Sequence, residues 1–302
     1  MLRSLLRGVL CVVLLMLSPA YGGTVALVLN QNSGPYADYA RTLGEQLDPG
    51  RHPLSLYATP DQFSAPPAGT ELIVAAGTEA LRQALLRGGN APILAVLLPR
   101  QSYERILAEQ GRGRSRVSAI YLDQPPARLA AFVRHLLPQQ RRVGLLLSSD
   151  TRGQFAAFRQ ALNQQGLIAD SEDSDHDQSL LTALNSLFSR NNLLLAIPDG
   201  NIYKRDNIRS ILVTSYRYQK PVIAFSAAFV QAGALAGLYS TPAQIARQTA
   251  ELIPSLGAGL PAPMPPSQFA ISINQHVAES LGLNLPDEAA LRRSLLSDRE
   301  AR

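Results

Sequence analysis

The chain has 302 residues, of which 46% are hydrophobic and 17% are charged, and its formal net charge at pH 7 is +5. This length and apolar content are sufficient for one large or two medium domains, each with its own core. The positive charge is small and no basic tail dominates, so the composition gives little support for nucleic-acid binding.

Residues 1–22 have the pattern of a secretory signal peptide. Arg3 and Arg7 precede an apolar stretch that is too short to span a bilayer, and small residues precede the expected cut after residue 22, with a cut after Ala20 as a close competitor. Cys11, the only cysteine, lies within this stretch. We therefore expect a soluble periplasmic protein whose mature chain has no disulfide, thiol nucleophile or thiolate metal site.

Apolar strands and amphipathic helices alternate from residue 23 onward. Continuous apolar strands separated by helices predict a parallel sheet that is covered on both faces. In the first half of the chain we expect strands over 25–29, 54–57, 72–76, 93–98 and 117–122, and helices over 36–47, 78–86 and 102–110.

The same alternation then restarts, and two βα runs of about 100 residues each predict two doubly wound lobes. In the second half we expect helices over 126–137, 152–165, 177–190, 204–218, 241–256 and from 276, and strands over 143–147, 167–170, 193–197, 222–225, 234–239 and 269–273.

The stretch between the last strands predicts how the lobes are joined. Residues 226–233 are too few for a crossover helix and are expected to form a loop at the carboxyl end of a strand, where open α/β sheets bind ligands. The strand over 234–239 would then leave the second lobe and return to the first, with a hinge at 238–240. We expect further crossings near Asp123 and Ser267.

These crossings predict a division of the chain. The expected parts are a signal peptide over 1–22, an N-terminal lobe over 23–122 and 240–266, and a C-terminal lobe over 123–239 and 267–302.

Four stretches resemble a known family in their order and spacing: 76–80 (AGTEA), 117–123 (VSAIYLD), 220–240 and 273–286. Over nearly all of 23–290 the chain resembles the type I periplasmic substrate-binding proteins of ABC transporters, in the branch that includes tryptophan-type binders. The resemblance implies the periplasmic binding protein-like I fold, a small-molecule ligand between the lobes and an ABC permease in the inner membrane as partner. One departure is that the family often has Asp-Pro after the fourth strand, where this chain has Leu98-Pro99-Arg100.

The candidate ligand residues are those that directly follow the predicted strands, together with one tyrosine at the hinge. Asp199 is expected to accept an ammonium group, and Tyr36, Tyr203 and Phe229 to enclose a planar apolar group. The alternative for most of them is ordinary helix capping, and for Phe229 it is core packing. The full set is Asn30, Tyr36, Gly77, Thr78, Arg100, Ser102, Ser149, Arg152, Asp199, Asn201, Tyr203, Ser226, Phe229 and Tyr239.

Two charged stretches are expected to be surface loops without a binding function. The acidic residues at 173, 175 and 177, with His176, are consecutive loop residues without a distant partner, so we expect a solvated loop rather than a metal site. The basic run over 111–116 lacks the context of a phosphate loop, and a surface loop is expected there, with contact to a membrane partner as the alternative.

The sequence has no catalytic constellation, so we expect a binding protein, not an enzyme, without a metal or other cofactor. The expected protein is a monomer that binds an amino acid or a related metabolite for an ABC transporter, with no nucleic-acid partner. Two alternatives stay open: a sensor or accessory protein that signals to a membrane receptor, and a bilobed α/β enzyme.

Overall fold

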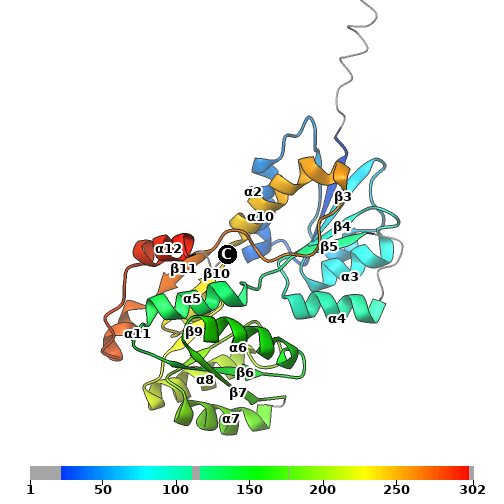
Figure 1. Cartoon of the computed structure of the whole chain (residues 1–302). Coiled ribbons are helices and arrows are strands. Elements are labelled where there is room, and N and C mark those ends of the chain that lie inside the picture. Colours follow the sequence, from blue (N-terminus) through cyan, green and yellow to red (C-terminus); the bar gives the residue numbers. More distant parts are fainter. Residues whose placement is uncertain (1–21, 111–115, 176, 299–302) are drawn as a thin grey trace, which may run out of the picture.

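The computed structural model describes residues 22–110, 116–175 and 177–298, which form two α/β lobes (Figure 1). All but the last residue of the predicted signal peptide, most of the basic run over 111–116, and His176 lie outside the described residues. None of the helices in the described part of the chain combines the length and the apolarity that a membrane span requires.

The N-terminal lobe is built on a five-stranded sheet with the order β2-β1-β3-β4-β5, in which all neighbours are parallel. Its strands are β1 (Thr24–Leu29), β2 (Leu54–Tyr57), β3 (Thr70–Ala76), β4 (Ile93–Val96) and β5 (Val117–Ile120). Its helices are α2 (Gly34–Gln46), α3 (Thr78–Arg87), α4 (Arg100–Gln110), α10 (Pro242–Leu252) and the 3-10 turns η1 (Pro60–Gln62) and η3 (Ile253–Ala258).

The C-terminal lobe has a six-stranded sheet with the order β11-β10-β9-β8-β6-β7, parallel except between β10 and β11. Its strands are β6 (Arg142–Leu147), β7 (Ile168–Asp173), β8 (Leu193–Leu195), β9 (Val222–Ala224), β10 (Ala236–Tyr239) and β11 (Ala270–Ile273). Its helices are α5 (Pro126–Leu136), α6 (Phe155–Gln164), α7 (Asp177–Arg190), α8 (Arg205–Tyr218), α9 (Ala227–Gln231), α11 (Gln275–Ser280), α12 (Glu288–Ser297) and the 3-10 turn η2 (Arg152–Gln154). The predicted class, two doubly wound parallel-sheet lobes, is confirmed.

Each sheet is buried on both faces, which explains why its strands are continuously apolar. On β1, Leu27 packs into the cluster that contains α2 and α10, whereas its neighbour Val28 packs into the cluster that contains α3 and α4. On β6, Leu145 and Leu146 divide in the same way between the two faces of the C-terminal sheet. Burying each of these side chains contributes about 1.5–3 kcal/mol.

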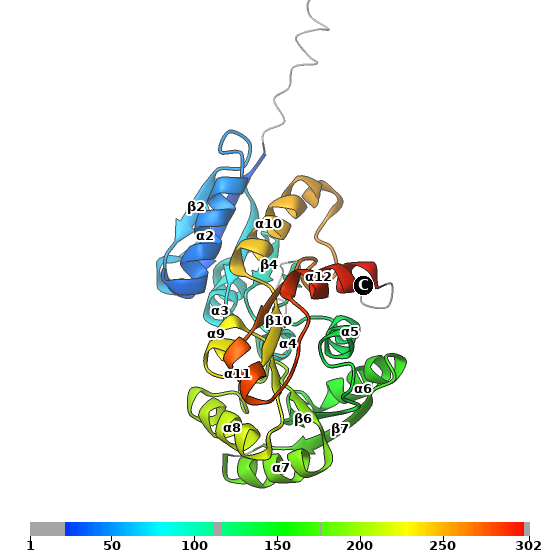
Figure 2. The same ribbon diagram turned by 90° about the vertical axis from the view of Figure 1, so that its left-hand side faces the viewer.

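The chain passes between the lobes after β5, after β10 and after η3 (Figures 1 and 2). At the second passage, Thr241 starts α10 with a capping box, in which its hydroxyl accepts from the backbone N–H of Gln244. α10 then packs on α2 in the N-terminal lobe, where the Tyr39 hydroxyl donates to Thr249 Oγ1 over 2.8 Å. α10 therefore belongs to the N-terminal lobe, although Thr249 lies 210 positions after Tyr39 in the sequence.

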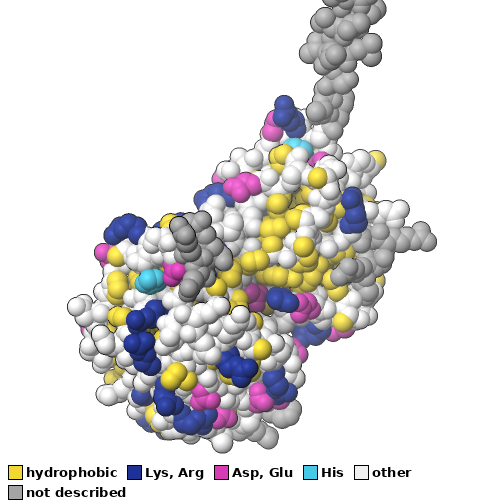
Figure 3. Space-filling model, viewed as in Figure 1, with side chains coloured by type: hydrophobic (Ala, Val, Ile, Leu, Met, Phe, Trp, Pro, Cys, Tyr) yellow, Lys and Arg dark blue, Asp and Glu magenta, His cyan; other side chains and the backbone are white. Residues whose placement is uncertain are grey.

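The third crossing forms backbone hydrogen bonds with the edge of the N-terminal sheet. Met264 accepts from the backbone N–H of Tyr121 over 3.0 Å and donates its own N–H to the Ala119 carbonyl over 2.9 Å. It thus forms an isolated parallel bridge with Ile120 on β5. Figure 3 shows a hydrophobic area on the upper lobe, over the region where this segment runs.

Several predicted boundaries are corrected. Residues 226–233, predicted as a loop, contain α9, because the Ser226 hydroxyl caps the helix by accepting from the Phe229 N–H over 3.2 Å. β10 does not leave the second lobe, since it pairs with β9 and β11 before the chain crosses at Ser240. The helix predicted over 152–165 begins as η2, and the single helix predicted from 276 is two helices, α11 and α12.

Candidate functional site

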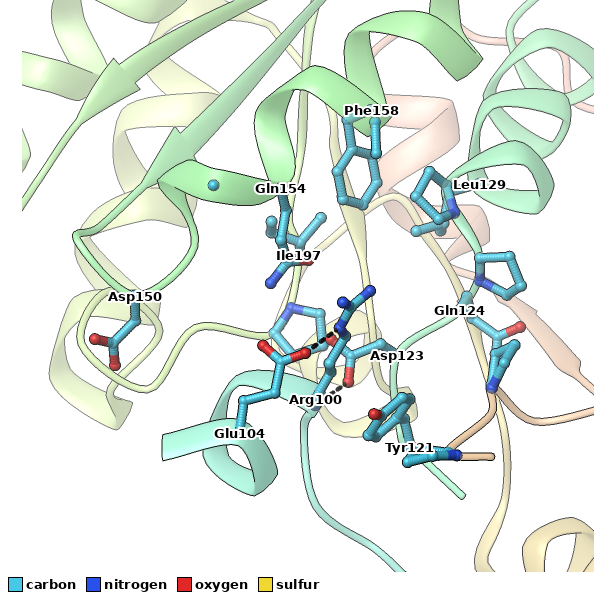
Figure 4. A pocket seen from close by; sticks show the side chains of 17 residues that line it. Arg100, Glu104, Tyr121, Asp123, Gln124, Leu129, Asp150, Gln154, Phe158 and Ile197 are labelled. Carbon is cyan, nitrogen blue, oxygen red and sulfur yellow. Dashed lines mark hydrogen bonds and ion pairs between the residues drawn. The ribbon is translucent and has the colours of Figure 1, made fainter. Parts of the chain in front are cut away.

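A cavity of about 730 Å³ lies between the two lobes, and we call it the interlobe pocket (Figure 4). Its walls combine charged, aromatic and proline side chains from both lobes and from the first and third crossings. It is lined by Arg100, Glu104, Tyr121, Asp123, Gln124, Pro125, Pro126, Leu129, Asp150, Gly153, Gln154, Ala157, Phe158, Ile197, Pro198, Pro263 and Pro265.

Arg100 enters the pocket from the N-terminal lobe because the chain turns sharply after β4. Leu97 has φ +55°, in the left-handed region that a leucine adopts only with strain. The Arg100 Nε donates to Glu104 Oε1 over 2.7 Å, and the arginine side chain remains 56% exposed. The guanidinium therefore keeps further donors that a bound anion can use.

Asp123 provides the pocket with a carboxylate from the first crossing. The backbone N–H of Arg100 donates to its Oδ2 over 2.7 Å, as Figure 4 shows. Burial raises the pKa of Asp123 to about 6, against the lowering effect of this hydrogen bond. No ion pair joins Asp123 to a cation of the described residues. A ligand ammonium group would stabilise its charged form.

The remaining walls are largely apolar. Leu129, Phe158 and Ile197 face the pocket from the C-terminal lobe and belong to the core on the α5–α6 side of its sheet. On the opposite wall, burial raises the pKa of Tyr121 to about 12, so its hydroxyl stays neutral. The pocket therefore joins a polar wall, on Arg100 and Asp123, to an apolar wall across the lobes.

An ion pair connects the lobes at the edge of this pocket. Arg105, on α4, approaches Asp150, which follows β6, with 2.9 Å between Nη1 and Oδ2. Arg105 also lies 4.0 Å from Glu109, which pairs in turn with Arg82 over 2.7 Å. Both interlobe side chains are partly exposed, so the contact is weak and sensitive to salt.

A buried polar cluster ties the three crossings together below the pocket. Arg128 donates through Nη1 to Gln124 Oε1 over 2.8 Å and to the Pro266 carbonyl over 3.0 Å. Gln124 Nε2 donates to the Ser240 hydroxyl over 2.8 Å. The Arg128 guanidinium also lies 5.3 Å from the centre of the Phe269 ring, and burial lowers its pKa. This Arg128 cluster joins residues from all three passages between the lobes, the third through the Pro266 backbone carbonyl.

Of the fourteen predicted ligand residues, only Arg100 lines the interlobe pocket. A second group gathers at the ends of β1 and β3, where Asn30 Oδ1 accepts from the Ala80 N–H over 3.0 Å. Gly77 has φ +100°, and a Cβ there would lie 2.7 Å from Asn30 and 3.0 Å from Tyr36. Thr78 starts α3 beside them, and Ser102 is buried in the first turn of α4.

Asp199 is only 3% exposed, and its carboxylate is fully engaged within the C-terminal lobe. Oδ2 accepts from the hydroxyls of Ser148 and Thr151 over 2.7 and 2.6 Å, and Oδ1 accepts from the backbone N–H of Asn201 over 2.9 Å. These bonds give Asp199 a structural role. Its predicted contact with a ligand ammonium stays a prediction, as does the ligand contact of Asn201.

Arg152 and Ser149 are both held by the acidic loop that follows β7. Arg152 pairs with Asp173 and Asp175 over 3.0 Å each, and the Ser149 N–H donates to Asp175 Oδ1 over 2.5 Å. The side chains of Asp173 and Asp175 are 54% and 37% exposed, so the segment is solvated as the sequence predicts, and it is ion-paired with Arg152 as well. Within the described residues no cluster of His, Cys, Asp and Glu is suited to a metal ion.

The last predicted residues lie away from the interlobe pocket. Tyr203 and Phe229 pack against each other on the α8–α9 side of the C-terminal sheet, with ring centres 5.8 Å apart, and Ser226 caps α9. Tyr239 shares a hydrogen bond of 2.7 Å with Ser272 across β10 and β11.

Sequence reasoning missed most of the lining, including Glu104, Tyr121, Asp123 and Phe158. Asp123 was identifiable in one respect, since the first crossing was predicted at this residue and crossings border any interlobe space. The chain has Leu98-Pro99-Arg100 where the family that it resembles often has Asp-Pro. The structure supplies a carboxylate at this end of β4 from another segment, because Asp123 accepts a hydrogen bond from the Arg100 backbone N–H.

Comparisons with known proteins identify the fold. No protein-family model and no curated protein matches the sequence. Among solved structures, the chain is similar to an ABC domain in complex with L-Trp from Streptococcus pneumonia, with a TM-score of 0.59 and 15% identity over 90% of this chain and 98% of that one. It is also similar to a conserved domain protein from Vibrio cholerae, with a TM-score of 0.60 and 14% identity over 90% and 98% of the two chains.

A third similar structure is the ligand-free, open form of a substrate-binding protein with adhesive properties from Clostridium difficile. Its TM-score is 0.65, with 13% identity over 88% of this chain and 96% of that one. At these identities the likeness concerns the fold, and the chain has the periplasmic binding protein-like I fold that its sequence predicts.

Proposed function

We propose that this protein is a periplasmic solute-binding protein that captures a small amphipathic molecule, an amino acid or a related metabolite, between its lobes for an ABC transporter. The observation that carries the proposal is the interlobe pocket, whose walls come from both lobes and which holds a carboxylate that forms no ion pair with a side chain of the described residues. A volume of about 730 Å³ is typical of small-molecule sites.

The pocket chemistry fits the two ends of an amino acid. Asp123 accepts the ammonium group, and the remaining donors of the Arg100 guanidinium receive the carboxylate. Leu129, Phe158 and Ile197 contact the apolar side chain. Because these groups come from different lobes and crossings, a ligand that touches all of them favours the arrangement in which the lobes are close.

Two structural relatives support this proposal, since one is titled as a complex with L-Trp and another as a substrate-binding protein. We propose further that the lobes, over 23–122 with 240–266 and 123–239 with 267–302, move as two bodies about the crossings. Export through the signal peptide over 1–22 and delivery to an inner-membrane permease complete the proposal, which assigns no catalytic step to the chain.

The ligand is found by mass spectrometry of small molecules released when the purified protein is denatured, followed by calorimetric titration. We expect Asp123→Asn and Arg100→Gln each to weaken binding at least tenfold, while Asp61→Asn, an exposed carboxylate in η1, leaves affinity unchanged. Unaltered affinity in both pocket variants would contradict the assigned site.

Transport is tested separately with the radiolabelled ligand. A strain that lacks this gene is expected to lose high-affinity uptake and to regain it when the wild-type gene, but not the Asp123→Asn gene, is restored. Full uptake in the deletion strain would contradict the transport role. The calorimetric titration tests ligand binding separately and would be unaffected by that result.

A further inference from the structure

A second cavity, of about 570 Å³, lies on the C-terminal lobe between α8 and α9, and we call it the α8–α9 groove. It shares no lining residue with the interlobe pocket. The helices α8 and α9 cover one face of the C-terminal sheet, and α5 and α6 cover the other (Figure 2). It is lined by Tyr203, Arg205, Ile208, Arg209, Leu212, Val213, Phe225, Ser226, Ala228, Phe229 and Ala232.

Three aromatic rings line the groove. Tyr203 meets Phe225 edge-on with ring centres 5.3 Å apart, and Phe225 and Phe229 meet in the same way at 5.7 Å. Ile208 and Leu212, one turn apart on α8, extend this surface. Tyr203 and Phe229 are buried behind Phe225, so the accessible apolar surface is that of Phe225, Ile208 and Leu212, which suits a flat apolar body.

The hydroxyl of Tyr203 is an unsatisfied polar group in this wall. The residue is only 8% exposed, and its hydroxyl has no hydrogen-bond partner among the described residues. Burial raises its pKa, so the group stays a neutral O–H that can donate or accept. Buried hydroxyls are nearly always paired, so this one is an unpaired polar group enclosed behind the apolar wall of the groove.

Two arginines stand at the opening of the groove. Arg205 and Arg209 are one turn apart on α8 and exposed, and neither forms an ion pair with a carboxylate of the described residues. Both lie in the N-terminal half of the helix, where its dipole also favours a negative charge. An apolar surface with two adjacent guanidinium groups matches a carboxylate attached to a flat ring.

We propose that the α8–α9 groove is a second ligand site, which binds a small aromatic carboxylic acid independently of the interlobe pocket. The ring lies against Phe225, Ile208 and Leu212, and the carboxylate bridges Arg205 and Arg209. The site gives this lobe a way to respond to a second metabolite.

The probe for this site is 2-naphthoate, with the neutral 2-naphthamide as its uncharged counterpart. The chain has no tryptophan, so the naphthyl fluorescence can be followed in a titration without indole emission. We expect one saturable site for 2-naphthoate and at least tenfold weaker binding of 2-naphthamide. No saturable binding, or equal binding of the two probes, would overturn the proposal.

Variants locate the bound probe. The double substitution Arg205→Gln with Arg209→Gln is expected to weaken 2-naphthoate at least tenfold. Arg217→Gln, at an exposed position on the same helix, serves as the matched control and leaves affinity unchanged. Arg100→Gln also leaves it unchanged, because that residue, which would receive a carboxylate in the interlobe pocket, does not line the groove. Full affinity in the double variant, or a loss in Arg100→Gln, would place the probe elsewhere.

Discussion

Replacing Arg128 by methionine tests whether the buried cluster holds the crossings together. Methionine is similar in length and retains contact with the Phe269 ring, but it donates no hydrogen bond. The Gln124 Oε1 and the Pro266 carbonyl, now bonded to Arg128 over 2.8 and 3.0 Å, would each lose a donor. The perturbation therefore removes one charge and two buried hydrogen bonds with little change in volume.

The expected magnitude follows from two opposing effects. A buried acceptor left without its donor costs about 1–3 kcal/mol, so two of them cost about 2–6 kcal/mol. Removing a desolvated guanidinium offsets part of this, since burying a charge is itself unfavourable by several kcal/mol. We expect the free energy of unfolding to fall by about 2–4 kcal/mol, because Arg128 is only 9% exposed and has little access to replacement water.

Two assays read the effect. Urea unfolding followed by circular dichroism gives the loss of stability, and small-angle X-ray scattering gives the spread of lobe separations, which should widen once the crossings are untied. Arg134→Met is the control, since Arg134 lies on the same helix and donates only to the exposed Pro138 carbonyl. If both variants unfold at the same urea concentration and scatter alike, the Arg128 cluster does not hold the crossings together.

Three further predictions concern single side chains. The folded pKa of Asp123, about 6, is above the ordinary value, so the folded protein binds more protons than the unfolded chain between about pH 4 and 6, and the Asp123 contribution to stability falls as pH rises through that range. Asp123→Asn should therefore have a free energy of unfolding about 3 kcal/mol above that of the wild type at pH 7, measured by urea unfolding, and nearly the same value at pH 4; no gain at pH 7 would contradict the raised pKa. Arg105→Gln breaks the interlobe ion pair and should weaken ligand binding less than about fivefold, an effect that 1 M salt reproduces in the wild type; a salt-independent loss would contradict it. Tyr39→Phe removes the hydrogen bond between α2 and α10 and should cost about 1 kcal/mol in urea unfolding, whereas the same change at the exposed Tyr216 should cost nothing.

The architecture was predictable because its signal is local and repeated. Strands such as β1 and β6 are apolar at successive positions, since both faces of each sheet are covered, and the intervening helices have clear starts. α9 was missed because a five-residue helix in a small-residue segment has the sequence pattern of a turn. Its one indication was Ser226, a good helix cap, which was interpreted as a ligand contact.

The site was less predictable because its geometry depends on contacts between distant segments. The rule that polar residues after strands face a ligand identified Arg100, yet it also selected Asp199 and Arg152, which are engaged by partners 21 to 51 positions away. Asp123 was overlooked for the converse reason, because its surroundings form only when the first crossing meets the start of α4.

The isolated bridge between Met264 and Ile120 on β5 affects whether another chain can pair with this edge of the N-terminal sheet. In a parallel pair the peptide groups of one residue face the neighbour and those of the flanking residues face outward, and the flanking residues here are Pro263 and Pro265. Proline has no backbone N–H, so Pro263 and Pro265 offer no outward donor to which a strand of another chain could hydrogen-bond. This edge of the N-terminal sheet is therefore protected against strand-to-strand association with another chain.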